Sequence, residues 1–150
     1  MKIISTNRKA LFDYTIDQTI EAGLVLSGDE VKSLRAGLVN LVGSFATITQ
    51  GNLSLLNCYI GPYSHASLKK DDQFTRRSRR LLVHRRELDK LAGAIARRGI
   101  TLVPLKLYFN ERGRIKIEIG LAKHKKSHER KEELRERDIG RETRRELKGQ

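Results

Sequence analysis

Residues 114–122 alternate between large aliphatic side chains and polar or small ones, and this pattern constrains the fold more than any other feature of the sequence. The aliphatic positions are Ile115, Ile117, Ile119 and Leu121, and the polar ones are Arg114, Lys116 and Glu118. Because successive side chains of a β-strand point to opposite faces, the spacing predicts a strand with one face in the core. Thr101–Phe109 is a second β-rich run, and the residues Asn110-Glu111-Arg112-Gly113 between the two runs are typical of a turn. The sequence therefore predicts an antiparallel hairpin, with Pro104 at an edge or a bulge of its first strand.

The residues before this hairpin predict further strands. Phe12–Leu26 is rich in Tyr, Thr, Ile, Val and Leu, and is predicted to form a long strand region that is bent or interrupted. Ser44–Thr49 and Leu53–Ile60 flank the turn residues Gln50-Gly51-Asn52, which predicts a second hairpin.

Two helices are expected between these strands. The first begins after Ser27, because Ser27 and Glu30 match a capping box, and ends at Gly37. The second covers Arg85–Arg98 and presents one apolar face, made of Leu88, Leu91, Ala92 and Ile95. Short helices on antiparallel strands predict a mainly β protein, and an antiparallel β-barrel of the oligonucleotide-binding (OB) type is the natural candidate.

The composition changes sharply after Ala122 and divides the chain into two predicted parts. Residues 1–122 carry a net charge of +9 and nearly all of the apolar residues, which predicts a folded body. Residues 123–150 carry +4 and only three large aliphatic residues, Leu134, Ile139 and Leu147. Their spacing forms no continuous helical stripe, so we expect a tail that is disordered when free and becomes helical on a surface.

The excess of positive charge indicates the kind of partner. The formal net charge of the 150 residues is +13, which predicts a polyanion, either a nucleic acid or an anionic membrane surface. The sequence contains no run of 18 apolar residues and no apolar segment at its N-terminus, so we expect a cytosolic protein that does not span a membrane. The single cysteine, Cys58, excludes an internal disulfide and a cysteine-based zinc site, and is expected to be buried.

The most basic stretch, Arg76–Arg86, holds six arginines in eleven residues and is called the basic segment below. Guanidinium groups bind phosphates and stack on bases, so the basic segment favours contact with RNA or DNA. A solvated loop before a helix is the alternative, although clustered positive charge at a helix N-terminus opposes the helix dipole.

The sequence offers little support for catalysis or for a cofactor. His124 and His128 share the spacing of a helical metal pair, but no suitable third ligand lies nearby, so no metal site is expected. Glu21 and Glu30 could be imagined as an acid/base pair, yet Glu30 is better explained as the capping-box residue. We expect neither an enzyme nor a bound cofactor.

Several short sequence motifs occur one after another along the chain. They are Asn7-Arg8-Lys9-Ala10, Glu21-Ala22-Gly23-Leu24, GDEVKSLRAG at 28–37, RRLL at 79–82, LKLYFN at 105–110, GRIKIEIGLAK at 113–123 and Lys125-Lys126. In this order the chain resembles the family of small protein B (SmpB), the tmRNA-binding proteins of bacterial trans-translation. The resemblance covers essentially the whole chain from Asn7 onward.

The resemblance implies an OB-like barrel that binds the tRNA-like end of tmRNA (SsrA RNA) and accompanies it to stalled ribosomes in the cytoplasm. It also implies that the tail enters the empty mRNA channel of the small ribosomal subunit and becomes helical near the decoding centre of 16S rRNA. The aminoacylated tmRNA complex with elongation factor Tu is the third implied partner. The family itself catalyses no reaction.

The resemblance also implies residues. Positions that the family uses to bind tmRNA correspond to Glu21, Leu82 and Lys116. Neighbouring candidates in or beside the same motifs are Asn7, Arg8, Lys32, Arg35 and His84, together with Arg79 and Arg80 of the basic segment. The ribosome-binding candidates of the tail are Lys123, Lys125, Lys126, His128, Arg130 and Lys131. Two alternatives stay open: Leu82 as a core residue, and Glu21 as the internal partner of an arginine.

The tail departs from the family pattern in two places. His124 stands where the family usually has Gly, which constrains the backbone at the root of the tail. Glu129-Arg130-Lys131 replaces the usual Asp-Lys-Arg, which preserves the charges but changes each side chain.

Two rival classes remain. A general OB protein for single strands relies on aromatic stacking, and only 5% of the residues here are aromatic. An RNA-processing enzyme would need a catalytic or metal constellation that the sequence does not show.

Overall fold

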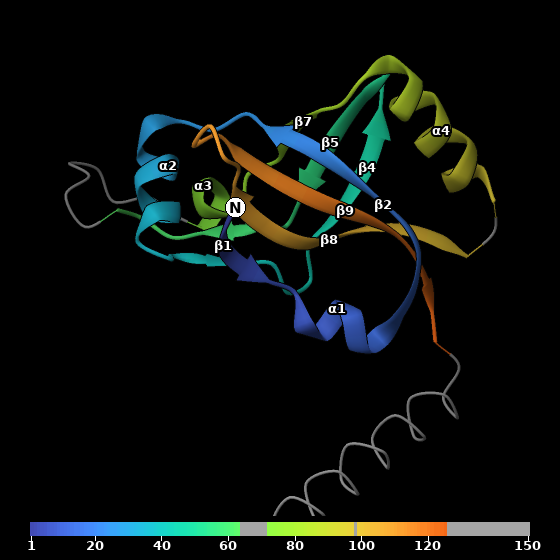
Figure 1. The fold of residues 1–150 in the computed structure, drawn as a ribbon, viewed down its shortest axis with the longest axis horizontal. Coiled ribbons are helices and arrows are strands. Elements are labelled where there is room, and N and C mark those ends of the chain that lie inside the picture. The colour runs from blue at the N-terminus through green and yellow to red at the C-terminus, as the bar shows by residue number, and fades with distance from the viewer. Residues whose placement is uncertain (64–71, 98, 126–150) are drawn as a thin grey trace, which may run out of the picture.

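A computed structural model describes residues 1–63, 72–97 and 99–125 (Figure 1). Its elements in chain order are β1 (Lys2–Thr6), α1 (Arg8–Asp13), β2 (Tyr14–Leu24), α2 (Gly28–Arg35), β3 (Val39–Asn40), β4 (Phe45–Thr49), β5 (Asn52–Leu56), β6 (Tyr59–Ile60), α3 (Asp72–Thr75), β7 (Arg79–Leu82), α4 (Arg85–Ala96), β8 (Ile100–Phe109) and β9 (Ile115–His124).

The main sheet closes into a barrel. Its strand order is β1-β8-β4-β5-β7-β2-β9. β8 and β9 also pair with each other, so the strands from β8 to β9 form a closed ring. All of these pairings are antiparallel, and β1 lies outside the ring against β8. The structure confirms the predicted mainly β, OB-like antiparallel barrel with short helices.

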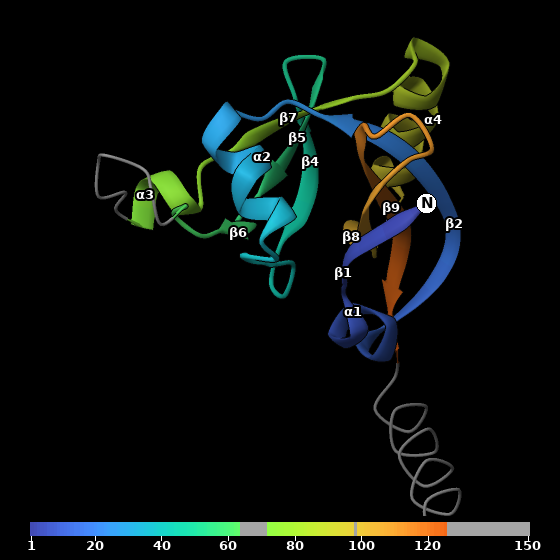
Figure 2. The ribbon, with the colours of Figure 1, turned by 60° about the vertical axis from the view of Figure 1, so that its left-hand side comes forward.

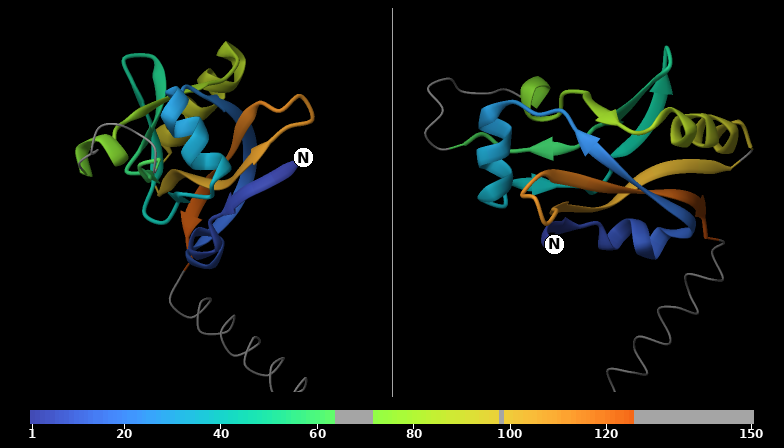
Figure 3. Two further views of the ribbon diagram at one scale, coloured as in Figure 1. Left: turned by 90° about the vertical axis from the view of Figure 1, so that its left-hand side faces the viewer. Right: turned by 45° about the horizontal axis from the view of Figure 1, so that its top comes forward.

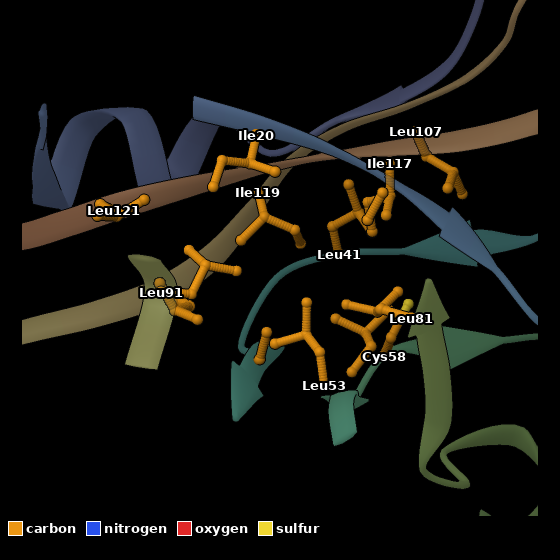
Figure 4. Close-up of a cluster of buried hydrophobic side chains, with 14 of the residues drawn as sticks. Ile20, Leu41, Leu53, Cys58, Leu81, Leu91, Leu107, Ile117, Ile119 and Leu121 are labelled. Carbon is orange, nitrogen blue, oxygen red and sulfur yellow. The ribbon is translucent and has the colours of Figure 1, made fainter. Parts of the chain in front are cut away.

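The hairpin of β8 and β9 forms as predicted. Its register runs from Ile100 opposite Lys123 to Phe109 opposite Ile115, with an irregularity between Pro104 and Lys106. The predicted bulge at Pro104 is therefore confirmed. The inner face of β9 enters the main apolar cluster, where its side chains lie beside those of β2, β5, β7 and α4 (Figure 4).

Two strands differ from their predicted bounds. Phe12 and Asp13 belong to α1, which begins because the Asn7 side chain accepts a hydrogen bond from the Ala10 N–H at 3.1 Å. Leu53–Ile60 is not one strand, because Asn57 adopts a φ of 59° and separates β5 from β6. The short β6 pairs with β3 in a second, two-stranded sheet.

The predicted caps of α2 are confirmed. The Ser27 side chain accepts from the Glu30 N–H, and the Glu30 carboxylate accepts from the Ser27 N–H at 3.0 Å. At the other end Gly37 has a φ of 77°, and the N–H groups of Gly37 and Leu38 donate to the carbonyls of Leu34 and Ser33. This is the Schellman motif, which explains why a glycine ends the helix.

α4 lies at the end of the barrel opposite α2 (Figures 1 and 3). Its buried residues are Leu91 and Ala94, and Leu88 packs against the same core. The prediction that Ala92 and Ile95 share this buried face is wrong, because both are exposed.

The body extends beyond the predicted boundary at residue 122. Lys123 and His124 continue β9, and the Lys125 N–H donates to the Asp13 carbonyl at 3.0 Å. α1 therefore lies beside the last described residues of the chain (Figure 2). Among the described residues, no helix is long and apolar enough to cross a membrane.

Candidate RNA interface

Three strands of the barrel bring three of the predicted residues together. β2 lies between β7 and β9 in the sheet, and Gly23 of β2 pairs with Leu82 on one side and Lys116 on the other. Glu21 lies two residues before Gly23 and therefore points to the same face of β2. Glu21, Leu82 and Lys116, which are far apart in the sequence, thus line one surface.

This surface is hollowed. The hollow has a volume of about 430 Å³, and we call it the Glu21 hollow; it is lined by Glu21, Gly23, Leu82, Val83, His84, Glu87 and Lys116. A second hollow of about 390 Å³ shares Gly23, Leu82 and Lys116 and continues towards Leu24, Leu26, Val31, Phe109 and Arg114. Val31 belongs to α2, so the two hollows connect the predicted site with that helix.

Gly23 lines the Glu21 hollow and has no side chain that would fill it. A methyl group added there would lie 3.5 Å from the Leu82 Cβ and 3.8 Å from the Lys116 Nζ, which are ordinary contact distances. The ammonium group of Lys116 therefore lies close to the backbone of β2. A larger side chain at residue 23 would occupy the hollow itself.

Leu82 is a surface residue. Its side chain is 51% exposed, although Leu81 beside it is buried in the core. The alternation on β7 places Arg79 and Leu81 inward and Arg80 and Leu82 outward. The alternative in which Leu82 belongs to the core is therefore wrong.

Glu21 is held by a tyrosine. The hydroxyl of Tyr108, which is 6% exposed on β8, donates a hydrogen bond to the Glu21 Oε2. Burial, this hydrogen bond and the negative charges of Glu21 and Glu118 raise the pKa of Tyr108 well above its usual range. The phenol therefore remains a donor at physiological pH, and the partner of Glu21 is a tyrosine where an arginine was the alternative.

The structure corrects the prediction for Arg79. Its side chain is fully buried, and its guanidinium donates to the Glu30 Oε2 at 2.6 Å and to the carbonyls of Cys58, Arg77 and Thr75. No atom of this side chain is available to an RNA. The guanidinium instead connects β7 with α2 and with the segments before β6 and after α3.

Glu30 completes this buried network. Arg77 donates to its Oε1 and Arg79 to its Oε2. Burial alone would raise the pKa of Glu30, but the hydrogen bonds from Arg77, the Ser27 N–H and Arg79 lower it below its usual value. Glu30 is therefore a charged structural residue in addition to its role in the capping box.

The rest of the basic segment is divided. Arg76, Arg80, Arg85 and Arg86 are exposed, but two of them have protein partners. Arg76 lies 5.4 Å from the ring centroid of Tyr59 and donates to Asn57 at 3.3 Å, and Arg85 lies 3.5 Å from the Asp89 carboxylate. The segment is therefore not one continuous array of free guanidinium groups.

Asn7 also proves to be structural. It is 3% exposed, caps α1, and donates through its amide nitrogen to the carbonyls of Leu41 and Pro104 at 3.3 and 2.9 Å. The prediction that Asn7 contacts RNA is corrected for the same reason as that for Arg79.

The other predicted residues are on the surface, but not all are near the Glu21 hollow. His84 lines the hollow just before α4, and its backbone N–H donates to the Glu87 Oε1 at 3.4 Å. Lys32 and Arg35 are on α2, where the Lys32 ammonium lies 5.7 Å from the ring centroid of Tyr63, and Arg8 is exposed at the start of α1. Lys123 and Lys125 lie at the end of the described chain, and Lys126, His128, Arg130 and Lys131 lie outside the described residues.

Sequence reasoning did not identify Gly23, Tyr108, Val83 or Glu87 as part of this surface. The available signal was partial: Gly23 and Tyr108 lie inside the two quoted strings that contain Glu21 and Leu105. Only the strand register shows that they meet.

Cys58 is buried as expected. Burial raises the pKa of its thiol to about 11, so the thiol is protonated and unreactive at neutral pH.

A closed antiparallel barrel with a strongly basic sequence and a polar hollow across neighbouring strands defines an OB-like protein of the nucleic-acid-binding class. Residues 4–149 match the family model described as SmpB protein, and the chain belongs to this family.

Proteins similar to the chain carry consistent descriptions. The SsrA-binding protein of Caulobacter vibrioides is 49% identical over 148 residues, which are 99% of this chain and 96% of that protein. The SsrA-binding protein of Bartonella henselae is 51% identical over 147 residues, 98% of this chain and 92% of that protein. Among solved structures, a chain in "tmRNA-SmpB: a journey to the center of the bacterial ribosome" is 52% identical with a TM-score of 0.68, covering 82% of this chain and 85% of that one.

Proposed function

We propose that this protein binds tmRNA at its tRNA-like domain and delivers it to stalled ribosomes for trans-translation. The observation that carries the proposal is the convergence of Glu21, Leu82 and Lys116 on one hollow from three separate strands. The descriptions of the similar proteins, which name SsrA binding and a tmRNA–SmpB structure, support the same function.

The residues of the surface suit an RNA that is partly unpaired. Lys116 can meet a phosphate, while the exposed Leu82 can pack against a base or a sugar. His84 adds a ring at the rim of the hollow, and the exposed Arg80 adds a guanidinium on the outer face of β7. Lys32 and Arg35 extend the positive charge along α2, and we place further phosphate contacts there.

We assign the ribosomal part of the function to the C-terminal tail. Lys123, Lys125, Lys126, His128, Arg130 and Lys131 carry positive charge or a ring towards 16S rRNA in the decoding centre and the empty mRNA channel. The aminoacylated tmRNA complex with elongation factor Tu is the remaining partner. The protein acts as a binding factor in the cytoplasm, where ribosomes are found, and catalyses no reaction itself.

A binding competition tests the proposed function. Labelled tmRNA is bound to the full chain, and unlabelled tmRNA, tRNA or random single strands are then added in increasing excess. We expect only tmRNA to displace the label efficiently. Equal displacement by tRNA or by random single strands would contradict the proposal and favour a general single-strand-binding protein.

A further inference from the structure

The Glu21 hollow contains an unexpected charge. A carboxylate repels phosphate oxygens, so an RNA-binding surface should avoid one unless the RNA offers a hydrogen-bond donor to it. Here Glu21 is exposed, Glu87 lines the same hollow, and Glu118 lies directly opposite Glu21 on β9. Lys116 is the one cation that lines the hollow among the described residues.

Tyr108 fixes this carboxylate in place. The Tyr108 hydroxyl donates to the Glu21 Oε2, and the tyrosine itself is 6% exposed on β8, so its position is set by the barrel wall. Within the described part of the chain, no group donates to the Glu21 Oε1. A carboxylate with one oxygen anchored from behind keeps Oε1, and a remaining lone pair of Oε2, for a partner in the hollow.

Only one natural nucleobase matches two adjacent carboxylate oxygens. The Watson–Crick edge of guanine presents two neighbouring donors, N1–H and the exocyclic N2 amine, whereas adenine and cytosine each present a single exocyclic amine. This edge is accessible in an unpaired nucleotide, which is the form of RNA that proteins read by sequence. The exposed Leu82 side chain in the same hollow offers an apolar surface for the face of the base.

We propose that Tyr108 is a positioning residue that holds the Glu21 carboxylate to bind the Watson–Crick edge of an unpaired guanine in the bound RNA. The proposal rests on the proposed function, because it specifies which group of the tRNA-like domain the hollow recognises. Lys116 binds the neighbouring backbone, and Glu21 supplies base selectivity.

Guanosine-to-inosine replacement tests this directly, because inosine keeps N1–H and lacks only the N2 amine. Each unpaired guanosine of a synthetic tRNA-like domain is replaced in turn, and the dissociation constant of the full chain is measured. We expect one replacement to weaken binding about tenfold or more, as for loss of a hydrogen bond to a charged group. The same replacement should have little effect on the affinity of the Glu21→Gln variant. The glutamine side chain turns its NH2 group, which cannot accept a hydrogen bond, towards one of the two donors of guanine.

Tyr108→Phe separates positioning from folding. The variant keeps the ring and loses only the hydroxyl, so we expect a folded protein whose melting temperature is lower by a few degrees at most, an unchanged salt dependence and a smaller inosine effect than in the wild type. Tyr59→Phe, on β6 beside Arg76 and outside the residues that line the Glu21 hollow, is the matched control and should retain the full inosine effect.

The outcomes distinguish the two levels of the proposal. Failure of the wild-type chain to bind the unmodified tRNA-like domain would overturn the proposed function. Binding with no inosine-sensitive position, or with the same sensitivity in Glu21→Gln or in Tyr108→Phe, would overturn the guanine inference alone.

Discussion

Gly23 shows how one residue opens a binding surface. The glycine lies on the middle strand of three, and an added methyl group would meet Leu82 and Lys116 at ordinary contact distances. We therefore expect Gly23→Ala to fold with an unchanged or slightly higher melting temperature, because alanine restricts the unfolded chain. Gly23→Leu should fill the Glu21 hollow and weaken tmRNA binding at least tenfold. Thermal melting and equilibrium binding measure both effects; equal affinity of Gly23→Leu and wild type would show that RNA does not enter the hollow.

Lys116 is expected to act through one phosphate. For Lys116→Ala we predict weaker tmRNA binding and a slope of log affinity against log salt concentration that is shallower by about one unit. Lys106→Ala is the matched control, because Lys106 lies on the neighbouring strand with its ammonium 4.0 Å from the Glu118 carboxylate. A salt slope that is unchanged in Lys116→Ala, or equally reduced in Lys106→Ala, would argue against a phosphate contact at Lys116.

At the scale of single residues, the sequence predicted the chemical role of a side chain better than it predicted whether that side chain is buried. Lys116 and Leu82 lie on the surface as the resemblance implied, whereas Arg79 lies in the core. Charge alone suggests an exposed arginine, and the compensating Glu30 is 49 residues away in the sequence. Only the alternation along β7, with Arg79 and Leu81 on the same face, carried a local signal.

The contact between α2 and β7 depends on a buried ion pair, so it should be sensitive to acid. Because the pKa of Glu30 is lowered in the folded protein, its contribution to stability is complete above its unfolded value of 4.5. That contribution is lost as the pH falls through the lower folded value. We expect the free energy of unfolding of the wild type to drop as the pH falls below about 4.5.

Glu30→Gln tests this element-level coupling. The substitution leaves the fully buried Arg79 without its anion, so we expect the free energy of unfolding to fall by about 3–5 kcal/mol at neutral pH. The remaining dependence on acid pH should be weaker than in the wild type. Urea denaturation at several pH values measures both quantities, and parallel pH curves for the two proteins would contradict the assignment of the acid transition to Glu30.

Elements with local signals were predicted well, and elements set by tertiary contacts were not. The α2 caps and the β8–β9 hairpin follow from neighbouring residues, and both are confirmed. α1 was missed because it is only six residues long and is followed directly by β2, and its cap residue Asn7 is fixed by distant carbonyls of Leu41 and Pro104.

At the scale of the whole molecule, the sequence predicted the class of fold, an antiparallel barrel, but not which strands pair to close it. The joining of β8 to β4 rests on a single paired position, Ala46 opposite Leu102, which no sequence pattern indicates. The Glu21 hollow lies away from this joint, where β2 pairs directly with β7 on one side and with β9 on the other.

The division between body and tail leads to a separate prediction. Deletion of residues 126–150 should leave tmRNA affinity nearly intact and abolish tagging on stalled ribosomes. The deletion should start at 126 because Lys123–Lys125 are joined to β2 and α1. Affinity and tagging are measured on the same preparation, and a large loss of tmRNA affinity would show that the tail, rather than the body, carries the main RNA-binding surface.

A hydroxyl-radical footprint on full-length tmRNA tests most directly whether the Glu21 hollow binds the tRNA-like domain. The wild-type chain is compared with the Leu82→Ala, Lys116→Ala double variant at protein concentrations that saturate the wild type. We predict protection within the tRNA-like domain by the wild type, and loss of that protection in a double variant that melts at nearly the same temperature. Protection confined to other parts of tmRNA, or an identical footprint from both proteins, would contradict this assignment.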